Sequence, residues 1–346
     1  MATIYDIARQ ANVSAMTVSR VINKTGRVSE KTRVKVQKVM DDMHYIPNSI
    51  ARCLVTQQSK VISLLIADIC NPFFTKVARG VEDAALKHGY KLMLGNSDEN
   101  LMKERHYIEM ILSMKVDGVL IAASSDLSIE HLQWLEKQKV PFVLLDREVP
   151  GIHADAVIGE SKNGTKKMIK QLIEMGHTRI GLLNGLDHVS TARERRLGYI
   201  EALIEADLPV DEHLMIEASY TPDNATKLID TWYGQQTDHK PTAIFAANNL
   251  LAQAVMNEAY ELGLRIPDDI SLACFDELSY TLEAQPFLSV VAQPAYEFGQ
   301  LGFKLLLERM KDTTLPRRLE HLPCEILLRD SVTTRQACPD SSVSFV

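Results

Sequence analysis

Residues 3–23, TIYDIARQANVSAMTVSRVIN, predict two short helices that meet at a tight turn. Apolar side chains recur at positions 4, 7, 8 and 11, which is the spacing of one helix face. Asn12-Val13-Ser14 interrupts this pattern, and Ser14 is a favourable N-cap for a second helix over 15–22. The stretch therefore predicts a helix, a turn and a second helix at the start of the chain.

A third helix follows these two. Ser29 is its N-cap and Pro47 ends it, with apolar positions at Val34, Val36, Val39 and Met43. Three helices in this order are typical of the helix-turn-helix plan, in which the second helix enters the major groove of DNA. An ordinary three-helix bundle has the same spacing and stays open as an alternative.

Charge is distributed unevenly along the 346 residues. Residues 1–58 carry nine Lys and Arg against four Asp and Glu, whereas the rest of the chain carries 29 against 41. A basic head on an acidic body fits a protein whose head alone meets a polyanion, although a chance cluster of solvated lysines would give the same count.

Composition excludes several other classes. No apolar run is long enough to span a membrane, and Asp6 and Arg9 lie where a signal peptide would be apolar. The five cysteines contain no C-x-x-C pair, which argues against a zinc ribbon and for reduced thiols. We expect a cytoplasmic protein with no metal, no cofactor and no membrane partner.

Beyond residue 60 the pattern changes to alternating strands and helices. Apolar, strand-like runs occur at 61–67, 91–95, 118–123, 142–146, 156–159, 179–185, 243–247 and 270–276. Such alternation predicts an α/β fold with doubly wound parallel sheets. Because the series restarts after Gly159, we expect two lobes with a ligand cleft between them, beyond the carboxyl ends of the strands.

The motif T-I-Y-D-I-A-x-x-A-x-V-S-x-x-T-V-S-R-V-I-N resembles the N-terminal signature of the lactose-repressor (LacI/GalR) family. The resemblance implies base contacts for Ala15, Met16 and Arg20. It implies further DNA contacts, mainly to phosphates, for Thr17, Ser19, Asn23, Ser29, Thr32 and Tyr45. In the hinge it implies a minor-groove wedge at Leu54 beside Asn48 and Ala51, although Leu54 could instead pack on the core.

The rest of the chain, up to about Asp330, resembles the two-lobed periplasmic-binding-protein-like core of the same family. Markers include Asn71-Pro72-Phe73-Phe74 and Gly176-His177. The implied domains are a head over 1–46, a hinge over 47–59, a core over 60–330 and a tail over 331–346. The implied N-lobe is 60–160 with 293–320, and the implied C-lobe is 161–292 with 321–330.

Strand-end positions matched to the family suggest an effector pocket. Its implied members are Phe73, Phe74, Asp146, Arg147, Arg195, Tyr220, Asn248, Asp276 and Gln293. Aromatic rings combined with carboxylates and guanidiniums suit a sugar or another polyhydroxylated ligand. Each residue also has a structural interpretation: Phe74 as core, Asp276 as a helix cap, Gln293 as a hydrogen bond at a crossing. Asn249 and Cys274 depart from the family pattern, which usually has aspartate and glycine there.

These patterns predict a sequence-specific repressor of carbohydrate-utilisation genes. We expect a homodimer that a small sugar releases from a palindromic operator. Control by a co-repressor or a phosphoprotein partner is the alternative. An enzyme is disfavoured because no P-loop, nucleophile-elbow or zinc-protease motif occurs. A secreted binding protein is disfavoured by the basic head, and the tail lacks the heptads of a coiled-coil tetramer.

Overall fold

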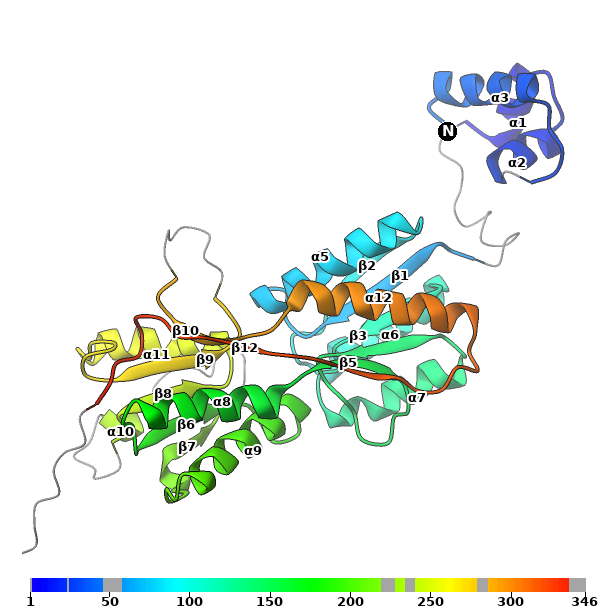
Figure 1. The fold of residues 1–346 in the computed structure, drawn as a ribbon. Coiled ribbons are helices and arrows are strands. Elements are labelled where there is room, and N and C mark those ends of the chain that lie inside the picture. Colours follow the sequence, from blue (N-terminus) through cyan, green and yellow to red (C-terminus); the bar gives the residue numbers. More distant parts are fainter. Residues whose placement is uncertain are drawn as a thin grey trace, which may run out of the picture. The chain divides into compact units, whose positions relative to one another are not determined.

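The computed structural model describes residues 2–23, 25–45, 58–218, 228–233, 240–278 and 286–335. The chain divides into two compact units, Met1–Lys60 and Val61–Val346. Figure 1 shows the first as a small helical head and the second as a larger core with two sheets.

Three helices form the head: α1 (Ile4–Gln10), α2 (Ala15–Asn23) and α3 (Glu30–Asp42). Thr3 and Asp6 form a capping box at the start of α1. Ile7, Val18 and Val36 are fully buried and hold the three helices together. Two expectations were wrong: Val34 is 60% exposed, and α3 ends at Asp42, ahead of Pro47, with His44 in the left-handed region.

The N-lobe of the core contains a six-stranded sheet in the order β11-β5-β4-β3-β1-β2, and every pair in it is parallel. Helices α5 and α12 cover one face, and α6 and α7 cover the other. The strands are β1 (Val61–Ile66), β2 (Lys91–Asn96), β3 (Gly118–Ile121), β4 (Phe142–Leu145), β5 (Asp155–Gly159) and β11 (Leu319–Leu322). The helices are α5 (Pro72–Lys87), α6 (Leu101–Met114), η1 (Asp126–Ser128), α7 (Ile129–Lys137) and α12 (Ala295–Lys311).

The C-lobe repeats this plan with a sheet in the order β12-β10-β9-β8-β6-β7, in which only the β10–β12 pair is antiparallel. Its strands are β6 (Ile180–Asn184), β7 (Met215–Glu217), β8 (Ala243–Ala246), β9 (Ser271–Phe275), β10 (Ser289–Ala292) and β12 (Glu325–Leu327). Its helices are α8 (Ser161–Glu174), α9 (Ser190–Glu205), η2 (Glu212–Leu214), α10 (Asp230–Tyr233) and α11 (Asn249–Glu261). The predicted α/β fold with doubly wound parallel sheets is confirmed.

Four strands escaped the sequence pattern: β7, β10, β11 and β12. Each has only three or four residues, and no residue of β7, β11 or β12 is buried, so none produces a long apolar run. Because β11 continues to Leu322, the last crossing between the lobes follows that residue and not residue 320. The described part of the tail also differs from expectation: Ser331 and Val332 are buried, and Val332 lies in the C-lobe core.

Two glycines let the helices α5 and α12 approach very closely. A Cβ atom on Gly80 would lie 2.1 Å from the carbonyl oxygen of Tyr296, and one on Gly299 would lie 2.1 Å from that of Val77. Any side chain at either position would force the helices apart, so this helix pair requires glycine at both.

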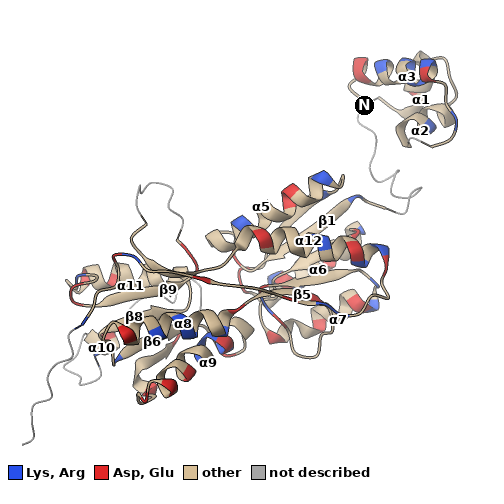
Figure 2. Ribbon diagram, viewed as in Figure 1, with Lys and Arg blue, Asp and Glu red and all other residues tan. Residues whose placement is uncertain are grey.

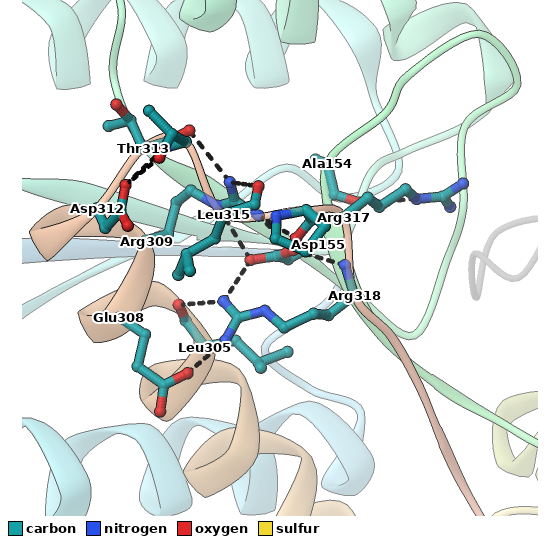
Figure 3. Close-up of polar contacts among 12 residues, drawn as sticks. Ala154, Asp155, Leu305, Glu308, Arg309, Asp312, Thr313, Leu315, Arg317 and Arg318 are labelled. Carbon is teal, nitrogen blue, oxygen red and sulfur yellow. Dashed lines mark hydrogen bonds and ion pairs between the residues drawn. The ribbon is translucent and has the colours of Figure 1, made fainter.

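A buried carboxylate fixes the end of α12 to the sheet (Figure 3). Asp155 at the start of β5 is fully buried and accepts hydrogen bonds of 2.7 Å from Arg309 Nη2 and from Arg318 Nη2. Burial alone would raise the pKa of Asp155, but the hydrogen bonds from Arg309 and Arg318 outweigh it and lower the pKa. Since Arg318 directly precedes β11, this cluster joins β5, α12 and β11.

Replacing Asp155 with alanine should lower the free energy of unfolding of the core by about 3 kcal/mol, because Arg309 and Arg318 would lose the buried carboxylate that they share. Urea unfolding at pH 7 measures this loss. Glu109→Ala is the control, since Glu109 pairs with Arg105 on the exposed face of α6 and should change stability very little. Equal effects of the two variants would contradict the role given to Asp155.

Candidate functional site

The outer face of α2 carries the side chains predicted to read bases. Met16 is 64% exposed and Arg20 is exposed, whereas Ala15 is only partly exposed and packs against the core of the head. On the opposite face Val18 and Val21 are buried, which fixes the orientation of α2. The helix therefore presents one long apolar side chain and one cation to solvent.

Two hydroxyl pairs occupy helix N-termini in the head. The Oγ of Ser14 lies 2.9 Å from the Oγ1 of Thr17 at α2, and the Oγ of Ser29 lies 2.8 Å from the Oγ1 of Thr32 at α3. Exposed hydroxyls at a helix N-terminus suit a phosphate. The family resemblance implied phosphate contacts for Thr17, Ser29 and Thr32, whereas Ser14 was predicted only as an N-cap, although the Ser-x-x-Thr spacing is the same at both helices.

The other DNA contacts predicted for the head lie in α2 or follow α3. Arg20 passes close to Gly26, where an added Cβ atom would lie 3.4 Å from Arg20 Cδ. Asn23 donates a hydrogen bond of 3.3 Å to Ser19 Oγ, and Tyr45 packs against the head core. Figure 2 shows Lys and Arg on α2 and α3. Asn48, Ala51 and Leu54 lie outside the described residues.

In the core, a cavity of about 340 Å³ opens over the carboxyl ends of β1, β2 and β4, between the lobes. We call it the effector cavity. Seven residues of the predicted pocket line it: Phe73, Phe74, Asp146, Arg147, Arg195, Asn248 and Asp276. Tyr220 lies outside the described residues.

Seven further residues line the cavity and were not predicted: Asp68, Cys70, Asn71, Asp98, Glu99, Thr191 and Leu250. Asp68, Asp98 and Glu99 follow the predicted strands 61–67 and 91–95 closely. The same strand-end argument that selected Asp146 could therefore have found these three acids.

The aromatic wall of the effector cavity comes from the first turn of α5. Asn71 caps this helix by accepting a hydrogen bond of 2.9 Å from the Phe73 amide. The rings of Phe73 and Phe74 meet edge to face with centroids 5.1 Å apart, and Phe73 also contacts Phe298 at 5.4 Å. Both phenylalanines are about 95% buried, so they contribute to the N-lobe core as well as to the cavity.

Two buried arginines are held by backbone carbonyls. Arg147 Nη1 donates to the carbonyls of Ala123 and Ser124, and its Nη2 lies 2.5 Å from Glu99 Oε1. Arg195 donates to the carbonyl of Ala247, and its guanidinium carbon lies 3.8 Å from the centroid of the Phe275 ring. These partners fix both guanidiniums before any ligand arrives.

Two aspartates occupy equivalent positions in the two lobes. Asp146 follows β4 and Asp276 follows β9, both with left-handed φ angles, of 65° and 67°. Burial raises the pKa of both side chains, and that of Asp276 reaches about 6. Burial also raises the pKa of Asp68. The cavity therefore contains carboxylates that are poorly solvated and ready to accept hydrogen bonds.

Gln293 does not line the effector cavity. Its Nε2 donates a hydrogen bond of 2.9 Å to Asp276 Oδ1, and its Oε1 lies only 1.9 Å from the position that a Cβ atom on Gly159 would take. Gly159 and Gln293 both lie on segments that cross between the lobes. The geometry favours the interpretation of Gln293 as a hydrogen bond at a crossing.

Asn249, one of the departures from the family pattern, bridges the two lobes. Its Nδ2 donates 2.9 Å to Asn71 Oδ1 of the N-lobe and 3.0 Å to the carbonyl oxygen of Glu277. Asn71 Oδ1 is an acceptor, since it accepts from the Phe73 amide, and the carbonyl oxygen of Glu277 can only accept. The side-chain atom of Asn249 that faces these two oxygens must therefore be a donor. Lys76 and Glu277 form an ion pair of 3.4 Å beside it.

Asn249→Asp should destabilise the core by about 1–3 kcal/mol, because a buried carboxylate would then face two acceptors. Thermal unfolding of the core measures the change. Asn100→Asp is the matched control: Asn100 Oδ1 only accepts, from the amides of Met102 and Lys103, and a carboxylate can do the same. If both variants were equally stable, the bridging role of Asn249 would be wrong.

Comparison with known proteins agrees with this architecture. Residues 3–48 match the bacterial regulatory proteins of the lacI family, and residues 169–332 match a periplasmic binding protein-like domain. The HTH-type transcriptional repressor PurR of Aliivibrio salmonicida is 36% identical over 333 residues, which is 96% of this chain and 99% of that protein. PurR of Vibrio atlanticus is 37% identical over 335 residues, with the same coverage.

Solved structures show the same fold. The lac repressor dimer bound to operator and the anti-inducer ONPF matches 96% of this chain and 99% of its own with a TM-score of 0.79 at 25% identity. The complex of the regulator CelR with cellobiose matches 96% of this chain and 100% of its own with a TM-score of 0.71 at 26% identity. A LacI family regulator from Enterococcus faecium with bound ribose matches 80% of this chain and 100% of its own with a TM-score of 0.70 at 27% identity.

A helical DNA-binding head and a two-lobed core define the class of two-domain transcription regulators. The chain belongs to the LacI family of bacterial regulatory proteins, and it is a DNA-binding transcriptional repressor and not an enzyme. Among the described residues, none of the helices has the length and apolarity to cross a membrane.

Proposed function

We propose that this repressor responds to an uncharged sugar that binds in the effector cavity. The observation that carries the proposal is the cavity lining, where Phe73 and Phe74 face a set of polar side chains. Carboxylates accept hydrogen bonds from hydroxyl groups, and aromatic rings pack against the apolar face of a sugar ring. This combination suits a ligand with many hydroxyl groups.

The balance of charge argues against an anionic effector. Five carboxylates line the cavity, those of Asp68, Asp98, Glu99, Asp146 and Asp276, against two guanidiniums. A phosphate there would face more negative than positive charge, and Arg147 is already paired with Glu99. A sugar phosphate is therefore disfavoured. A purine is the second candidate ligand, on the ground that similar repressors are named PurR.

Screening settles the ligand class. Monosaccharides, disaccharides, sugar phosphates and purine bases are added to the full-length protein while thermal unfolding is followed. A ligand that binds only the folded state raises the unfolding temperature. The proposal expects stabilisation by at least one uncharged sugar and none by phosphates, whereas stabilisation by purines alone would overturn it.

We propose that the head contacts DNA as the sequence implied. Base edges would be reached by Met16 and Arg20, and by Ala15, which is less exposed. Phosphates would be bound by the hydroxyl pairs of α2 and α3 together with Ser19, Asn23 and Tyr45. The hinge residues Asn48, Ala51 and Leu54 would enter the minor groove. Two heads of a homodimer would bind the two halves of a palindromic operator, and the lac repressor dimer is a structural precedent.

The sugar would release the operator by changing how the two lobes meet. Coupling of this kind between two sites amounts to about 1–3 kcal/mol. Co-repression, or control by a phosphoprotein partner, would instead strengthen DNA binding. Measuring operator affinity with and without the stabilising ligand distinguishes release from co-repression.

Replacing Arg20 with alanine should remove about 1–3 kcal/mol of preference for operator over scrambled DNA, since a guanidinium that reads bases would be lost. The operator is first enriched from a pool of random duplexes, and both affinities are then measured at one salt concentration. Lys38→Ala removes the same charge from the exposed surface of α3. It should weaken binding to both DNAs equally. Unchanged discrimination in the Arg20 variant would contradict the assignment of α2.

Effector affinity should fall as the pH is lowered from 7.5 to 5. With a pKa of about 6, Asp276 is mostly ionised at the higher pH, and only about a tenth of it is ionised one unit below its pKa. Protonation removes an acceptor, so the affinity should drop by up to roughly tenfold. Asp68 and Asp146, whose pKa values are also raised, act in the same direction. Calorimetric titration of the wild type and of Asp276→Asn tests this, because the variant should bind weakly and with less dependence on pH.

A further inference from the structure

A second cavity, of about 490 Å³, adjoins the effector cavity. It opens over the carboxyl ends of β4 and β5 and beside β11, whereas the effector cavity lies over β1, β2 and β4. Since β5 and β11 are the strands from which the chain crosses to the C-lobe, we call it the crossing-side cavity. Asp146 and Thr191 line both cavities, so a ligand that reaches past these two side chains would occupy both.

Hydrogen-bond donors enter the crossing-side cavity from two helices. The first turns of α8 and α9 line it, and among the described residues no side chain caps either helix, so the first backbone amides of both helices can donate to a ligand. Ser161, the first residue of α8, also lines the cavity and is 4% exposed. Its hydroxyl has no hydrogen-bond partner among the described residues, which is costly for a buried group unless a ligand or water completes it.

Acceptors and paired charges make up the rest of the lining. The carboxylates of Glu160 and Glu194 line the cavity together with that of Asp146. Three of its cations form ion pairs. Arg317 Nη2 lies 2.6 Å from Glu148 Oε1, and Lys162 Nζ lies 2.6 Å from Glu201 Oε1. Arg193 Nη1 lies 2.7 Å from Asp126 Oδ2. With its cations paired and carboxylates present, the cavity does not suit a phosphate. Backbone donors at two helix N-termini together with carboxylate acceptors suit an uncharged ligand rich in hydroxyl groups.

We propose that the effector is an uncharged sugar of two units, one in the effector cavity and one in the crossing-side cavity. This inference rests on the proposed function, because it assumes that the effector cavity binds a sugar. The first unit packs against Phe73 and Phe74, and the second receives hydrogen bonds from the start of α8 and gives them to Glu160 and Glu194. Because the second unit touches segments next to the crossings, it contacts both lobes where they are joined.

Asn163→Phe tests the second unit directly. Asn163 is exposed, lies in the first turn of α8 and lines the crossing-side cavity, so a phenyl ring there fills space and leaves the effector cavity unaltered. The matched control is Lys167→Phe, one turn further along α8, where the side chain is exposed and lines neither cavity. Calorimetric titrations use the full chain with cellobiose, maltose, lactose and sucrose, and with glucose, galactose, fructose and ribose.

The wild type and Lys167→Phe should bind one of the disaccharides at least tenfold more tightly than either of its component sugars. Asn163→Phe should weaken that disaccharide at least tenfold and change the affinity for the monosaccharide less than twofold. If a monosaccharide binds as tightly as every disaccharide and Asn163→Phe leaves all these affinities unchanged, the proposal of a second sugar unit is wrong. The proposed function, which needs only a sugar in the effector cavity, then stands. If the wild type and the control bind no sugar at all, the proposed function itself has failed.

Discussion

The core depends on the chain crossing between its two lobes three times: after β5, after β10 and between β11 and β12. Because the paired strands of each lobe are parallel apart from β10 and β12, their carboxyl ends gather along one edge. The crossings join these two edges, so the polar residues that follow the strands face one another across the cleft. This arrangement brings together Asp68, Asp146 and Asp276, each of which follows a strand directly or closely.

Bringing so many ionisable groups into a partly buried cleft has an electrostatic cost that the fold offsets locally. Arg147 and Arg195 each donate to backbone carbonyls, and Arg195 also stacks on Phe275. The carboxylates of Asp146 and Asp276 are buried, and their pKa values rise. Donors on a ligand would relieve this cost, which is the physical basis for a polyhydroxylated effector. Asp155 differs from these cavity carboxylates, because two arginines donate hydrogen bonds to it and lower its pKa.

Polar contacts join the two lobes in the part of the chain that the structure describes. Asn249 of α11 donates a hydrogen bond to Asn71, the N-cap of α5, and Arg193 of α9 pairs with Asp126 of η1. A few hydrogen bonds can exchange partners at small cost, whereas the apolar core of each lobe cannot. A ligand between the lobes can therefore shift their relation while each lobe keeps its packing. That is the property a repressor needs if an effector is to act on DNA binding at a distance.

The sequence by itself determined the class of fold and the kind of protein. Periodicity separated the helical head from the strand–helix core, since a helix face and a buried strand leave different patterns. The motif over 3–23 pointed to the family, and positions matched to the family predicted seven of the side chains that line the effector cavity. Short exposed strands such as β7 and β11 left no such pattern, because three or four residues with few buried side chains show no period.

Only the tertiary structure decided which elements distant in sequence contact one another. The crossing-side cavity is built from α8, α9 and the loop after β4, which are distant in sequence, so no local pattern could reveal it. The same holds for Asn249: its sequence neighbours suggested the effector pocket, yet its amide reaches Asn71 of the other lobe. Local patterns record which face of an element is buried, whereas contacts between elements depend on how the chain returns, and that is set by the fold as a whole.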